Sequence, residues 1–326
     1  SFKISIDGKY LSYITDSTKK NKEIKIIIKD LKNYGISIDE GMTSETEWIG
    51  EYGPYIQSAR KEIYQTFAKY LIENDLAYPC FCTADEVEAI RKEQENLKDR
   101  IGYYGKWARD RYLSRDEVIN KIKNGEKYVI RLKSPGKFEN KVIYDDLVKG
   151  KLELPENDLD IVIIKGDGLP TYHFAHLVDD HLMRTTHVIR GDEWLSSVPI
   201  HLQLFKIFNF KAPKYAHISP LLKEENGNRR KLSKRKDPEA AISFYHEKGI
   251  PTEAVLLYLC TVANSNFEMW YLQNKDKTVD DFKLEFKKIS SSGSLFDVEK
   301  LINISRNYIS LLKASEVYDK TLEYSK

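Results

Sequence analysis

The chain has few of the residues that stabilise small secreted scaffolds, since it contains only three cysteines, Cys80, Cys82 and Cys260, among 326 residues. Three thiols cannot form a disulfide framework, so a small disulfide-stapled fold is excluded and a reducing compartment, the cytoplasm, is expected. Long apolar runs are also missing. The longest, residues 254–263, is about half the roughly 20 residues that a membrane-spanning helix needs. The sequence therefore predicts no membrane partner.

An excess of charge of either sign is absent as well. Lys and Arg total 52 and Asp and Glu total 50, which leaves a formal net charge of +2. A nucleic-acid partner would have to bind a local basic patch, because the chain as a whole produces no strong positive field. The composition, with 41% hydrophobic and 31% charged residues, is that of a folded protein of about two domains.

Alternating strand and helix signals indicate an α/β protein. Residues 2–15 predict a strand pair that turns at Asp7-Gly8, and residues 20–34 predict an amphipathic helix. Further helices are predicted over 58–73, 84–98 and 115–124, and further strands over 128–132 and 160–164. After Pro238 the strand signal stops. A final all-α module is predicted there, with helices at 239–248, 251–264, 297–304 and 305–314.

The densest basic segment follows an Asn226-Gly227 turn and comprises Arg229, Arg230 and the run Lys231-Leu232-Ser233-Lys234-Arg235. Like charges at this spacing repel one another unless anions neutralise them. A basic loop of this kind fits a polyphosphate, because lysines stabilise the charge on transferring phosphate oxygens. The residues alone leave two other interpretations open, a solvated basic turn and a patch for the nucleic-acid backbone.

The run KLSKR resembles the KMSKS-type signature of class I aminoacyl-tRNA synthetases, and its context resembles bacterial glutamyl-tRNA synthetases over nearly the whole chain after residue 38. Four further segments agree in order: GPYIQSAR at 53–60, AYPCFCT at 77–83, DGLPTYHFAHLVDD at 167–180 and HVIRGDEWLSS at 187–197. The resemblance implies a Rossmann-type class I catalytic domain, present in part, with an α+β connective insertion and a C-terminal all-α stem-contact module.

The same resemblance implies four regions. Residues 1–73 would form the first, incomplete part of the catalytic domain, and residues 74–160 the connective insertion that binds the acceptor stem. Residues 161–238 would form the second part, with the KLSKR loop, and residues 239–326 the helical stem-contact domain. Lysines and arginines on the insertion would contact tRNA phosphates, which would make binding salt-dependent.

Site residues follow from the resemblance too. Catalytic roles on the phosphates of ATP, accompanied by magnesium, fall on Lys231, Ser233, Lys234 and Arg235. Glutamate binding falls on Tyr172, His176 and Arg190, and contacts with ATP or the tRNA end fall on Glu193, Trp194 and Leu232. Arg190 would offer a bidentate donor to the γ-carboxylate of glutamate.

The residues themselves leave alternatives to these roles. Arg190 could instead pair with the neighbouring Asp192 or Glu193, and a lone tryptophan such as Trp194 is more often part of a core. His173, which follows Tyr172, completes a polar cluster at the ends of predicted strands, where ligands of open α/β sheets bind.

Cys80 and Cys82 occupy the place where some members of this family bind zinc. Structural zinc takes four nitrogen or sulfur ligands, and Trp107 stands where a third cysteine would be expected. All seven histidines lie at position 173 or later, so none is close in sequence. We therefore expect no metal, and in particular no zinc, at this place.

The chain departs from the family near its N-terminus. Class I synthetases carry a HIGH-type motif that holds the ATP phosphates at a helix N-terminus, and here no histidine precedes His173. Residues 8–20 resemble the family's GKF-LRIEDTD stretch, with Tyr13 in place of Arg, Thr15 in place of Glu and Thr18 in place of the last Asp. A neutral Thr15 cannot supply the charge that would bind the ammonium of the substrate.

Two interpretations follow. In the first, the chain is a partial record of a glutamate-tRNA ligase that activates glutamate with ATP and transfers it to tRNA, and it lacks the HIGH motif and the anticodon-binding region. In the second, it is a catalytically degenerate paralogue that binds tRNA or a partner without forming adenylate. The tRNA partner would be glutamate-accepting, and the sequence leaves open whether glutamine tRNA is a second partner.

Overall fold

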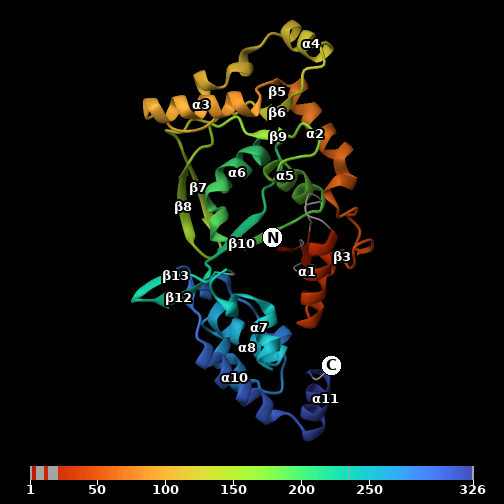
Figure 1. The fold of residues 1–326 in the computed structure, drawn as a ribbon, viewed down its shortest axis with the longest axis vertical. Helices are drawn as coiled ribbons and strands as arrows, with labels where there is room; N and C mark the ends of the chain where they lie inside the picture. The colour runs from red at the N-terminus through yellow and green to blue at the C-terminus, as the bar shows by residue number, and fades with distance from the viewer. Residues whose placement is uncertain (1, 5–10, 14–20, 234, 325–326) are drawn as a thin grey trace.

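The computed structural model describes residues 2–4, 11–13, 21–233 and 235–324 of the chain. The molecule is elongated, and its regions follow one another along the long axis (Figure 1). Helices of the insertion lie at one end, a mixed sheet lies in the middle, and the C-terminal helices lie at the other end. The expected α/β organisation is therefore present.

A six-stranded sheet with the order β11-β10-β1-β2-β3-β4 forms the centre. Its strands are β1 (Phe2–Ile4), β2 (Leu11–Tyr13), β3 (Glu40–Met42), β4 (Trp48–Ile49), β10 (His187–Gly191) and β11 (Lys214–Ile218). β1 and β2 pair antiparallel as predicted, and their predicted turn at Asp7-Gly8 lies outside the described residues. β10 and β11 run parallel and place Arg190 opposite His217.

The insertion contributes a second sheet and a hairpin. Its elements are β5 (Ala77–Cys80), α3 (Ala84–Leu97), α4 (Arg115–Lys123), β6 (Val129–Leu132), β7 (Lys141–Asp146) and β8 (Gly150–Pro155). Thr83 and Ser114 close capping boxes at the starts of α3 and α4, because each accepts from the N3 backbone N–H. β9 (Val162–Ile164) completes the three-stranded sheet β5-β6-β9, so this sheet continues past residue 160.

Helices pack between the two sheets and form the main core. They are α2 (Lys61–Glu73), α5 (Tyr172–Leu182) and α6 (Val198–Ile207). The helix α1 (Asn21–Asn33) lies outside this core, and its Ile28 packs with Met42, Tyr55 and Met183 in a separate cluster. The helices predicted at 20–34 and 58–73 are confirmed as α1 and as α2 with a preceding 3₁₀ turn, Gln57–Arg60. Tyr64, Phe174 and Leu204 are fully buried in this core, and each such side chain contributes about 1.5–3 kcal/mol. α5 reaches β11 through the contact of His176 with the Tyr215 hydroxyl, and α6 reaches β10 through the contact of His201 with Arg190.

The C-terminal region is mainly helical. Its elements are β12 (Leu221–Glu225), β13 (Asn228–Lys231), α7 (Ile242–Glu247), α8 (Thr252–Ala263), α9 (Phe267–Gln273), β14 (Ser294–Leu295), α10 (Val298–Leu311) and α11 (Ala314–Tyr324). The strand signal predicted to stop at Pro238 returns in β14, which pairs with β12. The two helices predicted at 297–304 and 305–314 are wrong, because no Gly or Pro separates them and one helix, α10, continues to Leu311.

Among the helices in the described ranges, the longest, α3 and α10, have 14 residues each. None of the described helices combines the length and the apolar character that crossing a membrane requires.

Candidate active site

Arg190 lies at the fourth position of β10, and its side chain is directed toward β11 and α6. Only 6% of its surface is exposed. Its Nε donates to Nε2 of His217 at 3.0 Å, and its Nη1 and Nη2 donate to Nδ1 of His201 and to the Trp194 carbonyl, both at 3.3 Å. An arginine head has five N–H donors, so one donor remains on each terminal nitrogen.

The contacts of Arg190 contain no carboxylate within the part of the chain that the structure describes. The alternative pairing with Asp192 or Glu193 is not formed, because Asp192 pairs with Lys149 at 3.2 Å and Glu193 lies 3.9 Å from Lys231. A buried cation is costly unless an anion or several hydrogen bonds compensate it. The site therefore holds a buried positive charge whose immediate ligands are neutral.

Two histidines that accept hydrogen bonds, His217 and His201, contact this cation. His201 accepts from Arg190, so its Nε2 donates to Nδ1 of His173 at 3.0 Å. Burial, together with the charges of His176 and Arg190, lowers the pKa of His173 to about 4. Near pH 7 His173 is therefore neutral and adds no positive charge to the site.

Tyr172 and Trp194 form the exposed edge of the site. Their ring centroids lie 4.4 Å apart, and 38% of the Tyr172 surface is exposed. Tyr172 is the first residue of α5. His176, one turn further along α5, is buried instead and contacts the Tyr215 hydroxyl at 3.0 Å and Asp180 at 2.7 Å.

The KLSKR loop begins where β13 ends, at Lys231. The turn before it is formed by Asn226 and Gly227, whose φ angles of 53° and 77° suit these two residue types. The Leu232 N–H donates to the Leu221 carbonyl at 2.9 Å, and the Ser233 N–H donates to Asp237 at 2.8 Å. Lys231 is exposed, with 62% of its side chain accessible.

The remaining loop residues differ in what the structure describes. Arg235 is exposed, and its N–H donates to the Ser233 hydroxyl at 3.4 Å, whereas Lys234 lies outside the described residues. Arg230 is not free, because it binds both oxygens of Asp237, at 2.6 and 2.8 Å. These hydrogen bonds from Arg230 hold the pKa of Asp237 well below its usual range. One basic residue thus anchors the loop while Lys231 stays exposed.

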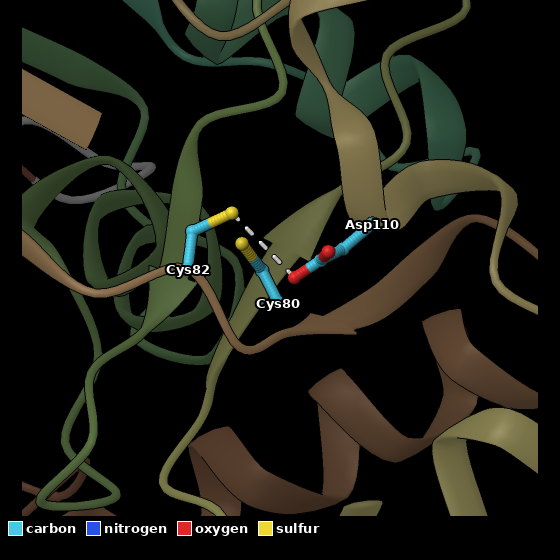
Figure 2. Close-up of side chains that lie close together, drawn as sticks. All are labelled: Cys80, Cys82 and Asp110. Atoms are coloured by element: carbon cyan, nitrogen blue, oxygen red, sulfur yellow. Dashed lines mark hydrogen bonds between the residues drawn. The ribbon is translucent and has the colours of Figure 1, made fainter. Parts of the chain in front are cut away.

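The cysteines predicted to bind no metal lie at the start of the insertion. Figure 2 shows Cys80, Cys82 and Asp110 with their side chains directed toward one another, and their ligand atoms lie within 4.8 Å of one another. Hydrogen bonds already occupy this cluster. The Phe81 N–H donates to Asp110 at 2.6 Å, and the Tyr103 hydroxyl lies 3.4 Å from Cys80 and 3.2 Å from Cys82. All three cysteines are free thiols.

The structure brings Tyr172, Arg190, Trp194 and Glu193 to one place. Lys231 lies next to this group, because its Nζ is 3.9 Å from Glu193.

Sequence reasoning missed Asp146, His201, His217, Asp237 and Asp110. A histidine inside the short apolar strand KYAHI was a usable signal for His217, since a polar residue among buried neighbours needs a partner. No local signal pointed to Asp146, whose partner lies 71 positions away.

Comparisons with known proteins give consistent results. A family profile described as tRNA synthetases class I (E and Q), catalytic domain, matches residues 14–303. The chain is 49% identical over 324 residues to a glutamate–tRNA ligase of Clostridium beijerinckii, covering 98% of this chain and 58% of that protein. It is 50% identical over 322 residues to a glutamate–tRNA ligase of Clostridium perfringens, covering 98% and 59%.

Solved structures give the same family. The glutamate tRNA ligase of Elizabethkingia meningosepticum, in complex with its amino acid, has a TM-score of 0.78 and 30% identity, covering 93% of this chain and 62% of that one. The glutamate-tRNA synthetase of Elizabethkingia anophelis has a TM-score of 0.81 and 28% identity, covering 97% and 67%. The chain spans about three fifths of the length of the curated relatives it matches.

Proposed function

The chain belongs to the class I tRNA synthetase family of the E and Q type, and from this premise we propose that it forms the amino-acid-activating part of a glutamate–tRNA ligase. The reaction joins the α-carboxylate of glutamate to the α-phosphate of ATP, which forms glutamyl-adenylate and releases pyrophosphate. Glutamate is then transferred to a 3′-terminal hydroxyl of a tRNA, and AMP is released. Positioning and charge stabilisation account for such a reaction without a covalent enzyme intermediate.

The buried charge of Arg190 is the observation that carries this proposal. Its ligands in the described residues, His201, His217 and the Trp194 carbonyl, are all neutral. One donor remains on each terminal nitrogen, and two such donors can bind the two oxygens of one carboxylate. The γ-carboxylate of glutamate fits this pair. The neutral amide of glutamine leaves the positive charge uncompensated, so the site favours the acid.

Tyr172 and His176 complete the proposed glutamate site in different ways. The Tyr172 ring is partly exposed beside Trp194, so its hydroxyl can orient the substrate directly. His176 is buried, and its ring packs against the Tyr172 ring with the centroids 6.1 Å apart. Tyr172 is therefore assigned direct contact with glutamate, and His176 acts through Tyr172.

The phosphates of ATP are assigned to the KLSKR loop. Lys231 is exposed, and its carboxylate contact among the described residues is the distant Glu193 at 3.9 Å, so phosphate oxygens can replace this contact. Ser233 and Arg235 follow on the same anchored turn, Lys234 belongs to the same run, and Leu232, Glu193 and Trp194 are assigned to ATP or the tRNA end. Magnesium prefers oxygen ligands, so it would enter on the phosphates and supply charge neutralisation there.

The tRNA contacts are assigned by region. Residues 74–160 would hold the acceptor stem through exposed basic residues such as Lys92, Arg115 and Lys123. Residues 239–326 would extend the contact along the stem, whereas residues 1–73 and 161–238 build the catalytic centre. A glutamate-accepting tRNA is the proposed partner, with glutamine tRNA as a second one to be tested, and the contacts would weaken with salt. The proposed compartment is the cytoplasm.

The test is ATP–pyrophosphate exchange on the full chain, with glutamate or glutamine and with or without tRNA. We expect exchange that depends on glutamate and is lost in Arg190→Leu. Exchange supported equally by glutamine would overturn the assignment of Arg190. Binding of tRNA without any exchange, both in this chain and in a version extended at its N-terminus, would favour the degenerate paralogue, in which Tyr13 and Thr15 have replaced charged residues of the family. Neither of these two side chains lies in the part that the structure describes.

A further inference from the structure

A carboxylate from the insertion reaches the candidate glutamate site through one histidine. Asp146, the last residue of β7, is 3% exposed, and His217 on β11 is fully buried. Nδ1 of His217 lies 2.6 Å from Oδ2 of Asp146, and its Nε2 lies 3.0 Å from Nε of Arg190. Three side chains from the insertion and from two strands of the central sheet thus form one line of hydrogen bonds.

The donors and acceptors of these three side chains determine which ring nitrogen of His217 carries the proton. Arginine has no acceptor, so Nε2 of His217 must carry a lone pair toward Arg190. The ring proton then sits on Nδ1 and is donated to Asp146. In the opposite tautomer an N–H of His217 would face the N–H of Arg190, and both would lose their partner. Asp146 therefore selects the tautomer that Arg190 requires.

Asp146 is itself held firmly. Its Oδ1 accepts backbone N–H groups of Val148, Lys149 and His217 at 3.0, 2.9 and 3.2 Å. Burial raises the pKa of Asp146, but the hydrogen bonds from His217 and from these backbone groups outweigh it and leave the pKa below its usual value. The Leu147 N–H also donates to the Tyr215 carbonyl at 2.8 Å, which ties the end of β7 to β11. The carboxylate thus stays charged and fixed in place.

We propose that Asp146 and His217 are positioning residues that orient the Arg190 guanidinium for a substrate carboxylate. The inference rests on the proposed function of Arg190. It makes recognition of the amino acid depend on the insertion, whose hairpin β7–β8 supplies the carboxylate. A displacement of this hairpin would break the contact between Asp146 and His217. The Arg190 guanidinium could then rotate away from the orientation that binds glutamate.

The experiment measures binding of glutamate, glutamine and ATP to the full chain by calorimetry. The His217→Leu variant removes the acceptor for Arg190, and we expect glutamate affinity to fall by about tenfold, which is the loss of one oriented hydrogen bond. The affinity for ATP should stay within about twofold of the wild type, because Lys231 is untouched. His217→Gln keeps an acceptor near the Nε2 position and should recover most of the glutamate affinity. The glutamate affinity of Asp146→Asn should lie between those of His217→Leu and His217→Gln.

A matched control separates positioning from simple attachment of the insertion. Gln203 on α6 also joins the two regions, through Asn157 at 2.9 Å and Ser134 at 3.0 Å, and it does not contact Arg190. Gln203→Leu should lower the unfolding midpoint about as much as His217→Leu and leave glutamate affinity unchanged. An equal loss of glutamate affinity in Gln203→Leu would overturn the proposal.

Nitrogen-15 chemical shifts of the histidine rings test the same line without any substrate. We expect His217 to be protonated on Nδ1 and not on Nε2, and the reverse tautomer would overturn the proposal. If the wild type binds glutamate and His217→Leu binds it equally well, only the positioning proposal is wrong. If the wild type binds ATP and no glutamate, the proposed function is wrong and the positioning proposal is wrong with it.

Discussion

Arg190 lies on β10 and Arg230 lies on β13, directly before the KLSKR loop, and the chain compensates their charges in opposite ways. Arg190 is buried, and its described ligands are two histidines and a carbonyl. Arg230 is nearer the surface and binds two carboxylates, Asp237 and Glu225. A cation that already holds its carboxylates serves as an anchor. A cation that is oriented by neutral ligands, with no carboxylate among the described residues, can bind the carboxylate of a substrate.

The largest effect is expected from Arg190→Leu. If the charge of Arg190 serves the substrate, its removal should weaken glutamate binding by roughly 100-fold or more, because losing one partner of a buried charge pair costs about 3 kcal/mol. The unfolding midpoint should fall as well, because His217, His201 and the Trp194 carbonyl lose their hydrogen-bond donor, so the titration is made well below that midpoint. Calorimetric titration with glutamate and a thermal unfolding curve measure the two quantities.

Arg190→Lys sharpens this test. Lysine keeps the positive charge but offers a point of contact in place of the two parallel donors. We expect most of the loss in glutamate affinity to persist in this variant. Wild-type glutamate affinity in Arg190→Lys would show that charge alone matters, and it would contradict the role assigned to the two donors of the guanidinium.

The next largest effect is expected at Lys149, whose charge, like that of Arg230, is compensated by a carboxylate of the chain. Its Nζ binds Asp192 at 3.2 Å, the Ser291 carbonyl at 2.6 Å and the Ser219 hydroxyl, so it joins the insertion, the central region and the C-terminal region. Lys149→Met should cost about 2 kcal/mol of unfolding free energy, since a hydrogen bond to a charged group contributes about 1.5–3 kcal/mol. Urea unfolding measures it.

Lys151, on the same hairpin but exposed, provides the matched control for Lys149. Lys151→Met should change the unfolding free energy by less than about 0.5 kcal/mol. Equal effects of the two substitutions would contradict the role of Lys149 as a junction between the three regions.

A smaller and pH-dependent effect is expected at the anchor of Arg230. The pKa of Asp237 in the folded chain lies below its ordinary value of 3.8, chiefly because of the hydrogen bonds from Arg230. Its contribution to stability is therefore present above pH 3.8 and is lost as the pH falls below that value. Asp237→Asn should destabilise the chain at pH 7, and the difference from the wild type should shrink in acid.

Denaturant unfolding at several pH values checks the behaviour of Asp237. Glu225→Gln is the control, because this carboxylate binds the same arginine but 54% of its side chain is exposed. Its substitution should have a weaker effect at every pH. A difference between Asp237→Asn and the wild type that stays constant down to pH 3 would contradict the lowered pKa.

The comparison of the two arginines also shows where sequence reasoning succeeds. Local patterns identified the helices at 20–34 and 84–98 and the strand at 128–132, since apolar spacing and capping residues act over a few positions. The resemblance drew attention to Arg190 and Lys231. The partners that decide their roles, Asp146 for the first and Asp237 for the loop of the second, depend on tertiary packing. Asp146 approaches His217 only because β7 packs against β11, a contact that no spacing encodes.

The cysteine cluster is where the smallest effect is expected, because here too the chain satisfies its own groups. Burial raises the pKa of the Cys80 thiol, which keeps it protonated near neutral pH, and Asp110 already accepts from the Phe81 N–H. A zinc ion would need deprotonated thiols and four ligands. The purified chain should therefore carry well below one zinc per molecule, and a chelator should leave its unfolding midpoint unchanged. Stoichiometric zinc that is lost in Asp110→Asn would contradict this and would place the cluster with Arg190, as a set of groups oriented for an external ion.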